Sequence, residues 1–465
     1  MIFPAQLFFD DTTETELIEL NSDRAIPEWL NGAFIRNGPS LFGAHTTKLN
    51  HWFDGMAMLH KFTFAQGKVS YMSKAPHSKA YLALRNQGKI GYDEFGTSQK
   101  QSLLKHILKL IQGKVTDNNN VNIIKYGDAY LAMTETDNHA LIEPNTLSII
   151  GRHSYPDKVK FAINLAHPIM DENHGKLYNL GIEFGKISSY TLYQTDIKSN
   201  TRQIIAKIPS QSVSYTHSFA KTENFFILYE NPFKLNLKNM FLSKKPFVEN
   251  HEWTDAGVDF SVINKNGEIV AKITADNFFC FHIVNSFEED DKIHLDLITY
   301  PNAEIIQSFY FKQEKTYTNI LPQLQRYTLD LTTSSYTKHT FTLNALEFAC
   351  INNHYAQKPY NYFYAVAALK NIDSELNSLI KVNLADLGAT KNWHEEDCYA
   401  GEPIFIAKPN ALSEDEGVVI ALVSNIANKT SFLLILDAIS FTELSRVTLP
   451  HLLPFGLHGS FAPAN

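Results

Sequence analysis

The sequence predicts an all-β fold, either a β-propeller or a large β-sandwich. Short apolar and aromatic runs alternate with turn residues along most of the chain, a pattern typical of antiparallel strands with tight connections. In the clearest meander, strand-like segments at 121–125, 130–134, 140–143 and 148–153 are separated by Gly127-Asp128, Asp137-Asn138 and Pro144-Asn145. The same rhythm returns at 176–208, 260–275, 278–300 and 416–449. Recurrent meanders of this kind indicate the blades of a propeller or the sheets of a sandwich.

Length and composition favour one folded domain covering residues 1–465. The chain is 44% hydrophobic and 19% charged, well away from the composition of disordered proteins. All-β architectures reach such lengths as one unit, and no Pro/Gly/Ser-rich linker or low-complexity tract divides this chain. With 41 basic and 49 acidic residues, the net charge of −8 argues against a nucleic-acid partner held by a general basic surface.

Cysteine usage and the N-terminal sequence predict a cytoplasmic protein. The three cysteines are Cys280, Cys350 and Cys398, and their spacing fits neither a disulfide scaffold nor a thiolate metal site. The first 20 residues lack a basic start, and Asp10 and Asp11 interrupt their apolar run, unlike a signal peptide. No run of about 20 apolar residues could span a bilayer. Contact with a membrane surface remains compatible with these features.

Two segments depart from this alternation of strand-like runs and turns. Residues 102–114 predict an amphipathic helix, with Ser102 as N-cap, Gly113 after its end, and apolar residues at helical spacing. Residues 232–247 combine apolar side chains with four lysines. Apolar area and lysine charge together suit an anionic membrane interface. Packing of each helix on the β core is the alternative, which composition alone favours.

Four of the 18 histidines share a local context. His167, His217, His282 and His458 each lie among apolar or small residues near a predicted strand end or turn. Neutral imidazole is the commonest metal ligand in proteins, so four such residues could form a metal site. Each one taken singly is also compatible with a hydrogen-bonded structural histidine. The spacing alone does not decide between these readings.

A series of motifs in order along the chain resembles the carotenoid cleavage oxygenase family, and most of all its animal branch of β-carotene oxygenases and the retinoid isomerase of the retinal pigment epithelium. The resemblance is specific and covers nearly the whole chain. The motifs are NGAFIRNGPSLF (31–42), HWFDGMAMLHKFTF (51–64), TETD (134–137), AHPIMDENHGKLYNLG (166–181), YTHSFAKTENFFILYENP (215–232), FHIVN (281–285), LEF (346–348), GEPIFIAKPNALSEDEGVVIALVSN (401–425), LLILDA (433–438) and LHGSF (457–461).

The resemblance implies a seven-bladed β-propeller with iron(II) on its axis and a cap of loops and helices enclosing a hydrophobic tunnel. It implies that the four histidines above are the iron ligands. It also implies that Glu135, Glu347 and Glu402 accept hydrogen bonds from His217, His282 and His458, respectively. Such carboxylates fix the tautomer of a ligating imidazole and raise its basicity.

The resemblance further implies oxidative cleavage of a carotenoid or apocarotenoid double bond by O2 into two carbonyl products. Four ligands leave iron open positions for dioxygen and substrate. Thr134 matches the family position whose methyl group narrows one of these. The lining positions for the polyene fall on Phe53, Phe95, Phe281 and Tyr300, although aromatic core packing also explains each of them.

The resemblance also favours membrane docking through 102–114 and 232–247, because a lipid-soluble substrate must leave a bilayer. The expected protein is therefore cytoplasmic and peripherally bound to membrane. A retinoid isomerohydrolase and a stilbene-cleaving oxygenase are alternative enzymes on the same scaffold. A propeller that only binds, with a degenerate site, is the alternative from another class.

Overall fold

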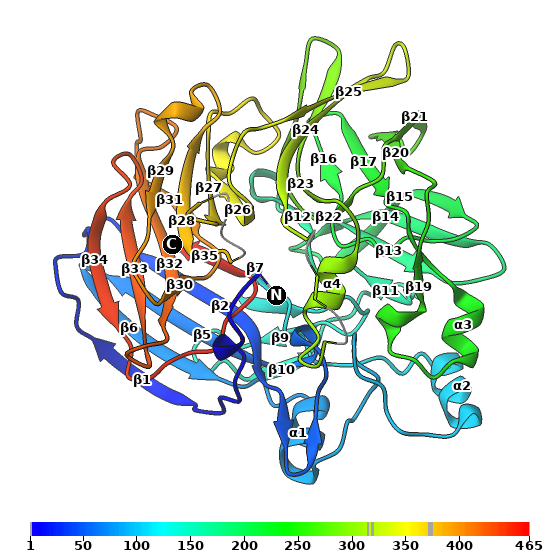
Figure 1. The fold of residues 1–465 in the computed structure, drawn as a ribbon, viewed down its shortest axis with the longest axis horizontal. Coiled ribbons are helices and arrows are strands. Elements are labelled where there is room, and N and C mark those ends of the chain that lie inside the picture. Colours follow the sequence, from blue (N-terminus) through cyan, green and yellow to red (C-terminus); the bar gives the residue numbers. More distant parts are fainter. Residues whose placement is uncertain (1, 314–315, 318–319, 371–374, 465) are drawn as a thin grey trace.

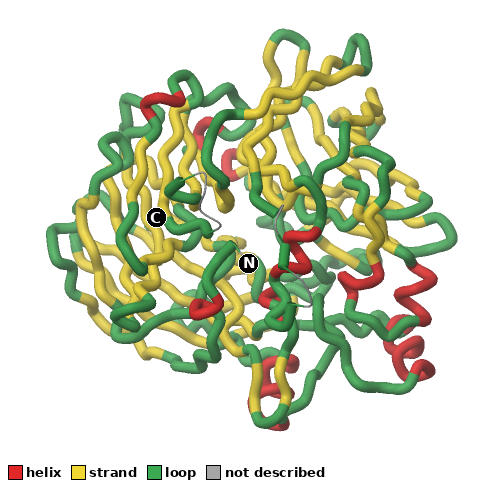
Figure 2. Tube along the Cα trace, in the orientation of Figure 1, coloured by secondary structure: helices red, strands yellow, loops and turns green. Residues whose placement is uncertain are grey.

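The computed structural model describes residues 2–313, 316–317, 320–370 and 375–464 of the chain. Seven antiparallel sheets of four or five strands are arranged around a centre, as Figure 1 shows, so the predicted seven-bladed β-propeller is confirmed. We number the sheets as blades 1 to 7, starting from the one that contains the N-terminal strand. Strands make up far more of the trace in Figure 2 than helices, which are few and short.

The first four blades are formed by the following strands. Blade 1 contains β1 (Thr15–Leu20), β6 (Lys68–Lys74), β5 (Met56–Ala65), β2 (Gly32–Leu41) and β35 (Gly459–Pro463). Blade 2 contains β7 (Asn122–Tyr126), β8 (Ala129–Met133), β9 (Ala140–Ile142) and β10 (Ile149–Arg152). Blade 3 contains β11 (Ile163–Asn164), β12 (Ile169–Asp171), β13 (Lys176–Glu183), β14 (Ser188–Asp196) and β15 (Thr201–Ser210). Blade 4 contains β16 (Ala220–Lys221), β17 (Phe225–Glu230), β20 (Val258–Asn264) and β21 (Ile269–Ala275).

The remaining blades and two small hairpins complete the strands. Blade 5 contains β22 (Phe279–Glu289), β23 (Lys292–Tyr300), β24 (Gln323–Asp330) and β25 (Ser335–Thr340). Blade 6 contains β26 (Leu346–Ile351), β27 (Tyr362–Ala367), β28 (Ser378–Asn383) and β29 (Lys391–Trp393). Blade 7 contains β30 (Cys398–Ala400), β31 (Ile404–Ala407), β32 (Gly417–Asn425), β33 (Thr430–Asp437) and β34 (Glu443–Thr448). The hairpins pair β3 (Gly43–Ala44) with β4 (Thr47–Lys48), and β18 (Phe233–Leu235) with β19 (His251–Trp253).

Blade 1 joins the two ends of the chain and so closes the ring. Its strand β35 pairs antiparallel with β2, in a register that places Arg36 opposite Gly459 and Gly32 opposite Pro463. Gly32 has a φ of +143°, and a Cβ there would lie 2.4 Å from the carbonyl oxygen of Ala462. Only glycine allows the two strands to approach so closely at this point.

The blades stack face to face, which explains why their middle strands are largely buried. All nine residues of β32 are buried, because each face of its sheet is covered by a neighbour. The outer strand β25 has the opposite pattern and exposes five of its six residues. The meander predicted at 121–153 is confirmed as the four strands of blade 2, with no strand end displaced by more than one residue.

The helices lie outside the blades. They are α1 (Lys79–Gln87), α2 (Leu103–Ile111), α3 (Leu237–Leu242) and α4 (Glu304–Ser308), with short 3-10 turns at Ala5–Leu7, Trp52–Asp54, Glu172–His174, Phe247–Asn250, Asn353–Tyr355 and Leu387–Ala389. The helix predicted at 102–114 is confirmed as α2. It lies beside α3 at the edge of the molecule (Figure 1), and the His106 ring bonds to the carbonyl of Met240 at 2.9 Å.

The segment 232–247 differs in part from the sequence prediction. Its apolar residues were expected to share one membrane-facing surface, but Phe233 and Met240 are buried in the core. The reason is that the segment begins as strand β18, which alternates its side chains, and only then becomes the short helix α3. Leu242 remains outside, with 52% of its surface exposed.

Candidate metal centre and its cavity

Each blade contributes one histidine or glutamate to the centre of the propeller. The four histidines come from blades 1, 3, 4 and 5. His458 precedes β35, His167 lies between β11 and β12, His217 precedes β16, and His282 lies within β22. The three glutamates come from the other blades: Glu135 follows β8, Glu347 lies in β26, and Glu402 lies between β30 and β31. The circular fold thereby brings together residues that are far apart in sequence.

The four imidazoles face one another. One nitrogen from each of His167, His217, His282 and His458 lies within 4.8 Å of the others, and the Nε2 atoms of His282 and His458 are 3.2 Å apart. The His167 ring centroid is 4.4 Å from that of His217 and 4.5 Å from that of His458. His167 Nε2 is buried and has no hydrogen-bond partner. A buried polar atom of this kind needs a partner, and a cation among the four rings would supply one.

Three of the four rings are oriented by carboxylates. The Nδ1 atoms of His217, His282 and His458 donate to the predicted glutamates. The distances are 2.5 Å to Glu135 Oε1, 2.6 Å to Glu347 Oε2 and 2.8 Å to Glu402 Oε1. Because Nδ1 carries the proton in each pair, the lone pair of Nε2 is directed at the centre.

Backbone irregularities aim two of these side chains inward. The register of β22 against β23 shifts between Cys280 and Ile283, on either side of His282. The register of β26 against β27 shifts directly after Glu347, where Phe348 has a φ of +54°. Bulges of this kind redirect side chains next to functional sites. They explain how residues inside regular strands can point toward the axis.

Burial keeps two of the rings neutral. Burial, and then the neighbouring imidazoles, hold the pKa of His167 and His458 well below its ordinary value. His282 differs, because the charge of Glu347 and the hydrogen bond to it outweigh burial and raise the pKa of His282. Neutral imidazoles are the form that binds metal ions. The donor set of four nitrogens backed by three carboxylates therefore fits a transition metal such as iron.

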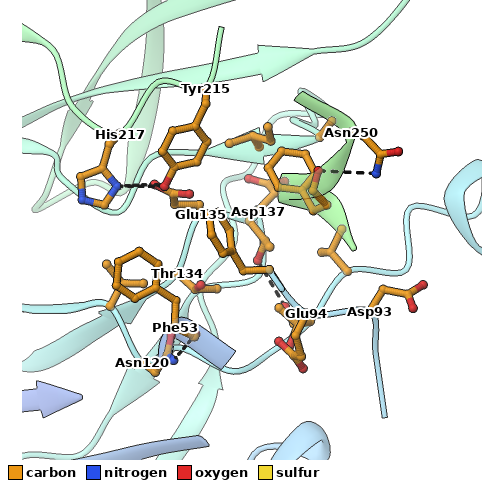
Figure 3. Close-up of a pocket in the computed structure, with 18 of the residues that line it drawn as sticks. Phe53, Asp93, Glu94, Asn120, Thr134, Glu135, Asp137, Tyr215, His217 and Asn250 are labelled. Carbon is orange, nitrogen blue, oxygen red and sulfur yellow. Dashed lines mark hydrogen bonds and ion pairs between the residues drawn. The ribbon is translucent and has the colours of Figure 1, made fainter. Parts of the chain in front are cut away.

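A cavity of about 770 Å³ opens beside the histidines, and its wall is rich in aromatic side chains. Its volume lies within the range of small-molecule sites in proteins, roughly 300–1,000 Å³. All four predicted lining residues, Phe53, Phe95, Phe281 and Tyr300, are on its wall, and so is Thr134. Figure 3 shows Thr134 and Phe53 near the pair of Glu135 and His217. The other aromatic wall residues are Phe3, Trp52, Phe161, Phe184, Tyr215, Phe241, Phe247, Phe309 and Phe348.

The cavity wall also includes residues of both outer helices. His106, Lys109 and Ile111 of α2 line it, as do Met240 and Phe241 of α3. Charged residues also line the cavity, namely Asp93, Lys114, Asp137, Arg152, Lys160, Glu183 and Lys245. The cavity therefore joins the histidines to the edge of the molecule at α2 and α3.

Sequence reasoning missed several residues of the site. Glu94 lines the cavity (Figure 3) and accepts a hydrogen bond from Thr116 at 2.9 Å. Burial and the charge of Asp54 raise the pKa of Glu94 well above its usual value. Arg36 forms a buried ion pair with Glu402 at 3.1 Å. Arg36 stands in the motif NGAFIRNGPSLF, so that motif carried the signal, but nothing in it indicated the partner.

Comparison with known proteins decides the family. The model of the family described as retinal pigment epithelial membrane protein matches residues 8–463. The chain belongs to this family of carotenoid cleavage oxygenases. Family relatives include the human β,β-carotene 15,15'-dioxygenase (Homo sapiens), 31% identical over 94% of this chain and 90% of that protein. Carotenoid cleavage dioxygenase 8 of Arabidopsis thaliana is 31% identical over 96% of this chain and 83% of that protein.

Solved structures of the family share the fold. A variant of Synechocystis apocarotenoid oxygenase superposes with a TM-score of 0.88 at 26% identity, covering 99% of this chain and 98% of that one. The cobalt-substituted form of the same oxygenase gives the same TM-score and coverage. Among the described residues, no helix is long and apolar enough to cross a bilayer.

Proposed function

We propose that this protein is a non-haem iron(II) dioxygenase that cleaves a conjugated double bond of a carotenoid or apocarotenoid. One observation carries the proposal: four inward-facing imidazoles have nitrogens within 4.8 Å of one another, and three of them line a cavity of about 770 Å³ that is rich in aromatic side chains. Its relatives named as carotenoid dioxygenases support the same chemistry. In the balanced reaction, the carbon–carbon double bond and the O2 bond break, and each product carbonyl receives one oxygen atom.

His167, His217, His282 and His458 would hold the metal, which fits their neutral nitrogen donors. Bound iron(II) would supply the one-electron chemistry that lets dioxygen react with an alkene. Glu135, Glu347 and Glu402 hold the Nδ1 protons of three ligands, so these rings keep their orientation during turnover. The carboxylates also offset positive charge in a buried place, where an unbalanced charge is costly.

The cavity wall positions the polyene and excludes water. Phe53, Phe95 and Phe281 form one connected aromatic group, since the Phe53 centroid is 5.6 Å from that of Phe95 and 6.1 Å from that of Phe281. Flat rings of this kind suit the faces of a conjugated chain. Tyr300 donates to Glu347 Oε1 at 2.9 Å, so its hydroxyl serves the carboxylate while its ring lines the cavity. We assign Thr134 to limiting the space beside the metal.

Membrane docking through α2 would deliver the substrate. Its apolar side chains face outward: Leu104 is 70% exposed and Ile111 is 71% exposed. Lys105 and Lys114 are exposed nearby, which suits an anionic headgroup layer. Because Ile111 also lines the cavity, a polyene leaving the bilayer at this point would enter the cavity directly.

The reaction is tested with protein reconstituted anaerobically with ferrous iron. The protein is then incubated with several carotenoids and apocarotenoids under ¹⁸O-labelled dioxygen, and the products are identified by chromatography and mass spectrometry. We expect two carbonyl products, each carrying one labelled oxygen when it is trapped before exchange with water. Release of a retinoid alcohol from an ester without labelled oxygen would indicate isomerohydrolase chemistry instead. Absence of bound metal together with absence of any product would favour a binding scaffold.

A further inference from the structure

The three glutamates behind the histidines differ in their second side-chain partner. Tyr215 donates its hydroxyl to Glu135 at 3.1 Å, and Tyr300 donates to Glu347 at 2.9 Å. Glu402 instead pairs with a cation: Arg36 Nη1 lies 3.1 Å from its Oε2. Two carboxylates are therefore held by neutral hydroxyl donors, and the third is paired with a positively charged side chain.

Arg36 is built into this place. Its residue is 1% exposed, and its second terminal nitrogen, Nη2, is buried without a hydrogen-bond partner. Burial lowers the pKa of Arg36 to about 10, partly offset by the charge of Glu402, so the guanidinium stays charged at neutral pH. Burying an arginine is costly unless its charge is paired with an opposite charge. Glu402 is its carboxylate partner among the described residues.

Three glycines leave room for the guanidinium. A Cβ at Gly401 would lie 2.7 Å from Arg36 Nη2, one at Gly456 would lie 3.0 Å from Nε, and one at Gly459 would lie 3.3 Å from Cδ. These glycines flank Glu402 and His458 in sequence. The close packing shows that the chain around the site is shaped to fit Arg36, so the pair with Glu402 is not an incidental contact.

The charges of the centre then add to a definite value. Three carboxylates contribute −3 and Arg36 contributes +1, while the four imidazoles, which bind a metal ion in their neutral form, contribute nothing, so the total is −2. A divalent cation neutralises this group, whereas a trivalent one leaves a buried excess of +1. Without Arg36 the total would be −3, which a trivalent cation would balance. Buried assemblies with a net charge are strongly disfavoured.

We propose that Arg36 is a positioning residue that sets the charge of the metal centre and thereby favours iron(II) over iron(III). It acts through Glu402, which in turn holds the Nδ1 proton of His458. The inference rests on the proposed function, since it presupposes that the histidines bind iron. It extends that function, because it assigns the preference for the reduced metal to a residue that touches neither the metal nor the substrate.

The test measures the Fe(III)/Fe(II) midpoint potential in the wild type and in charge variants of the full-length holoprotein. Arg36→Met makes the charge −3, Glu402→Gln makes it −1, and the double variant returns it to −2. We expect the potential to fall in Arg36→Met, with the ratio of ferric to ferrous affinity rising on the order of tenfold. It should rise in Glu402→Gln and return near the wild-type value in the double variant.

A purely structural role for Arg36 predicts a different order of midpoint potentials. In that case the potential of the double variant departs further from the wild-type value than that of either single variant. That order, or an unchanged potential in Arg36→Met, would overturn the inference. If Arg36→Met does not fold, the double variant and Glu402→Gln still test the charge rule, because neither leaves an unpaired buried carboxylate at this position. Binding of cobalt(II), followed by its visible spectrum, separates the two proposals: a wild type that binds neither cobalt nor iron disproves the proposed function itself.

Discussion

The centre of the propeller and the edge at α2 and α3 are built on opposite principles. At the centre, His217, His282 and His458 each have a carboxylate partner within 2.8 Å, and the bulges in β22 and β26 fix the backbone behind them. At the edge, Leu104 and Ile111 expose most of their apolar surface. Precise orientation serves chemistry on a metal, whereas exposed apolar area suits a fluid lipid surface. The cavity connects these two regions.

The largest effect is expected from removing a proposed ligand. His282→Ala takes away one of four nitrogen donors and leaves the buried Glu347 without its imidazole partner. We expect metal binding and cleavage to be lost, with metal content after anaerobic reconstitution reduced more than 100-fold, while the circular dichroism spectrum keeps its β signal. His294→Ala is the matched control, since His294 lies on the neighbouring strand β23 and bonds to Thr328. Full activity in His282→Ala would refute the ligand assignment.

A smaller effect is expected from the residue behind that ligand. Glu347→Gln keeps the shape of the side chain but removes the charge that His282 and Tyr300 bind. Losing such a partner costs about 10–100-fold in metal affinity or activity. A cobalt(II) titration measures the affinity, with Glu289→Gln at the exposed end of β22 as control. Equal affinities in both variants would show that the carboxylate has no role in holding the ligand.

The sequence predicted the centre better than its surroundings. Turn residues between apolar runs predict strands locally, so the meander of blade 2 was found from spacing alone. The grouping of His167 with His458 depends on ring closure by β35, which no local pattern encodes, and the family motifs supplied it. Arg36 was missed because its partner lies 366 positions away along the chain.

The segment 232–247 shows a different limit of sequence reasoning. Its composition predicted an amphipathic surface element, but composition does not reveal that Phe233 belongs to a strand and Met240 to the buried side of α3. The predicted membrane contact is therefore restricted to the exposed apolar side chains of α2 and to Leu242.

The smallest effect is expected at this edge, because each side chain adds only its own buried area to membrane binding. Replacing Leu104 and Leu108 together by serine should weaken binding to anionic vesicles by about tenfold, since each apolar side chain contributes up to roughly 1.5–3 kcal/mol when fully buried and these two exposed residues of α2 would be partly buried. Vesicle cosedimentation measures the partition.

Leu412→Ser is the control, because Leu412 is 96% exposed but lies in blade 7, between β31 and β32. If the α2 variant binds vesicles as well as the Leu412→Ser control does, α2 is not the docking surface. If only the α2 variant loses binding while it cleaves detergent-solubilised substrate at the normal rate, delivery and chemistry are separate tasks of the two regions.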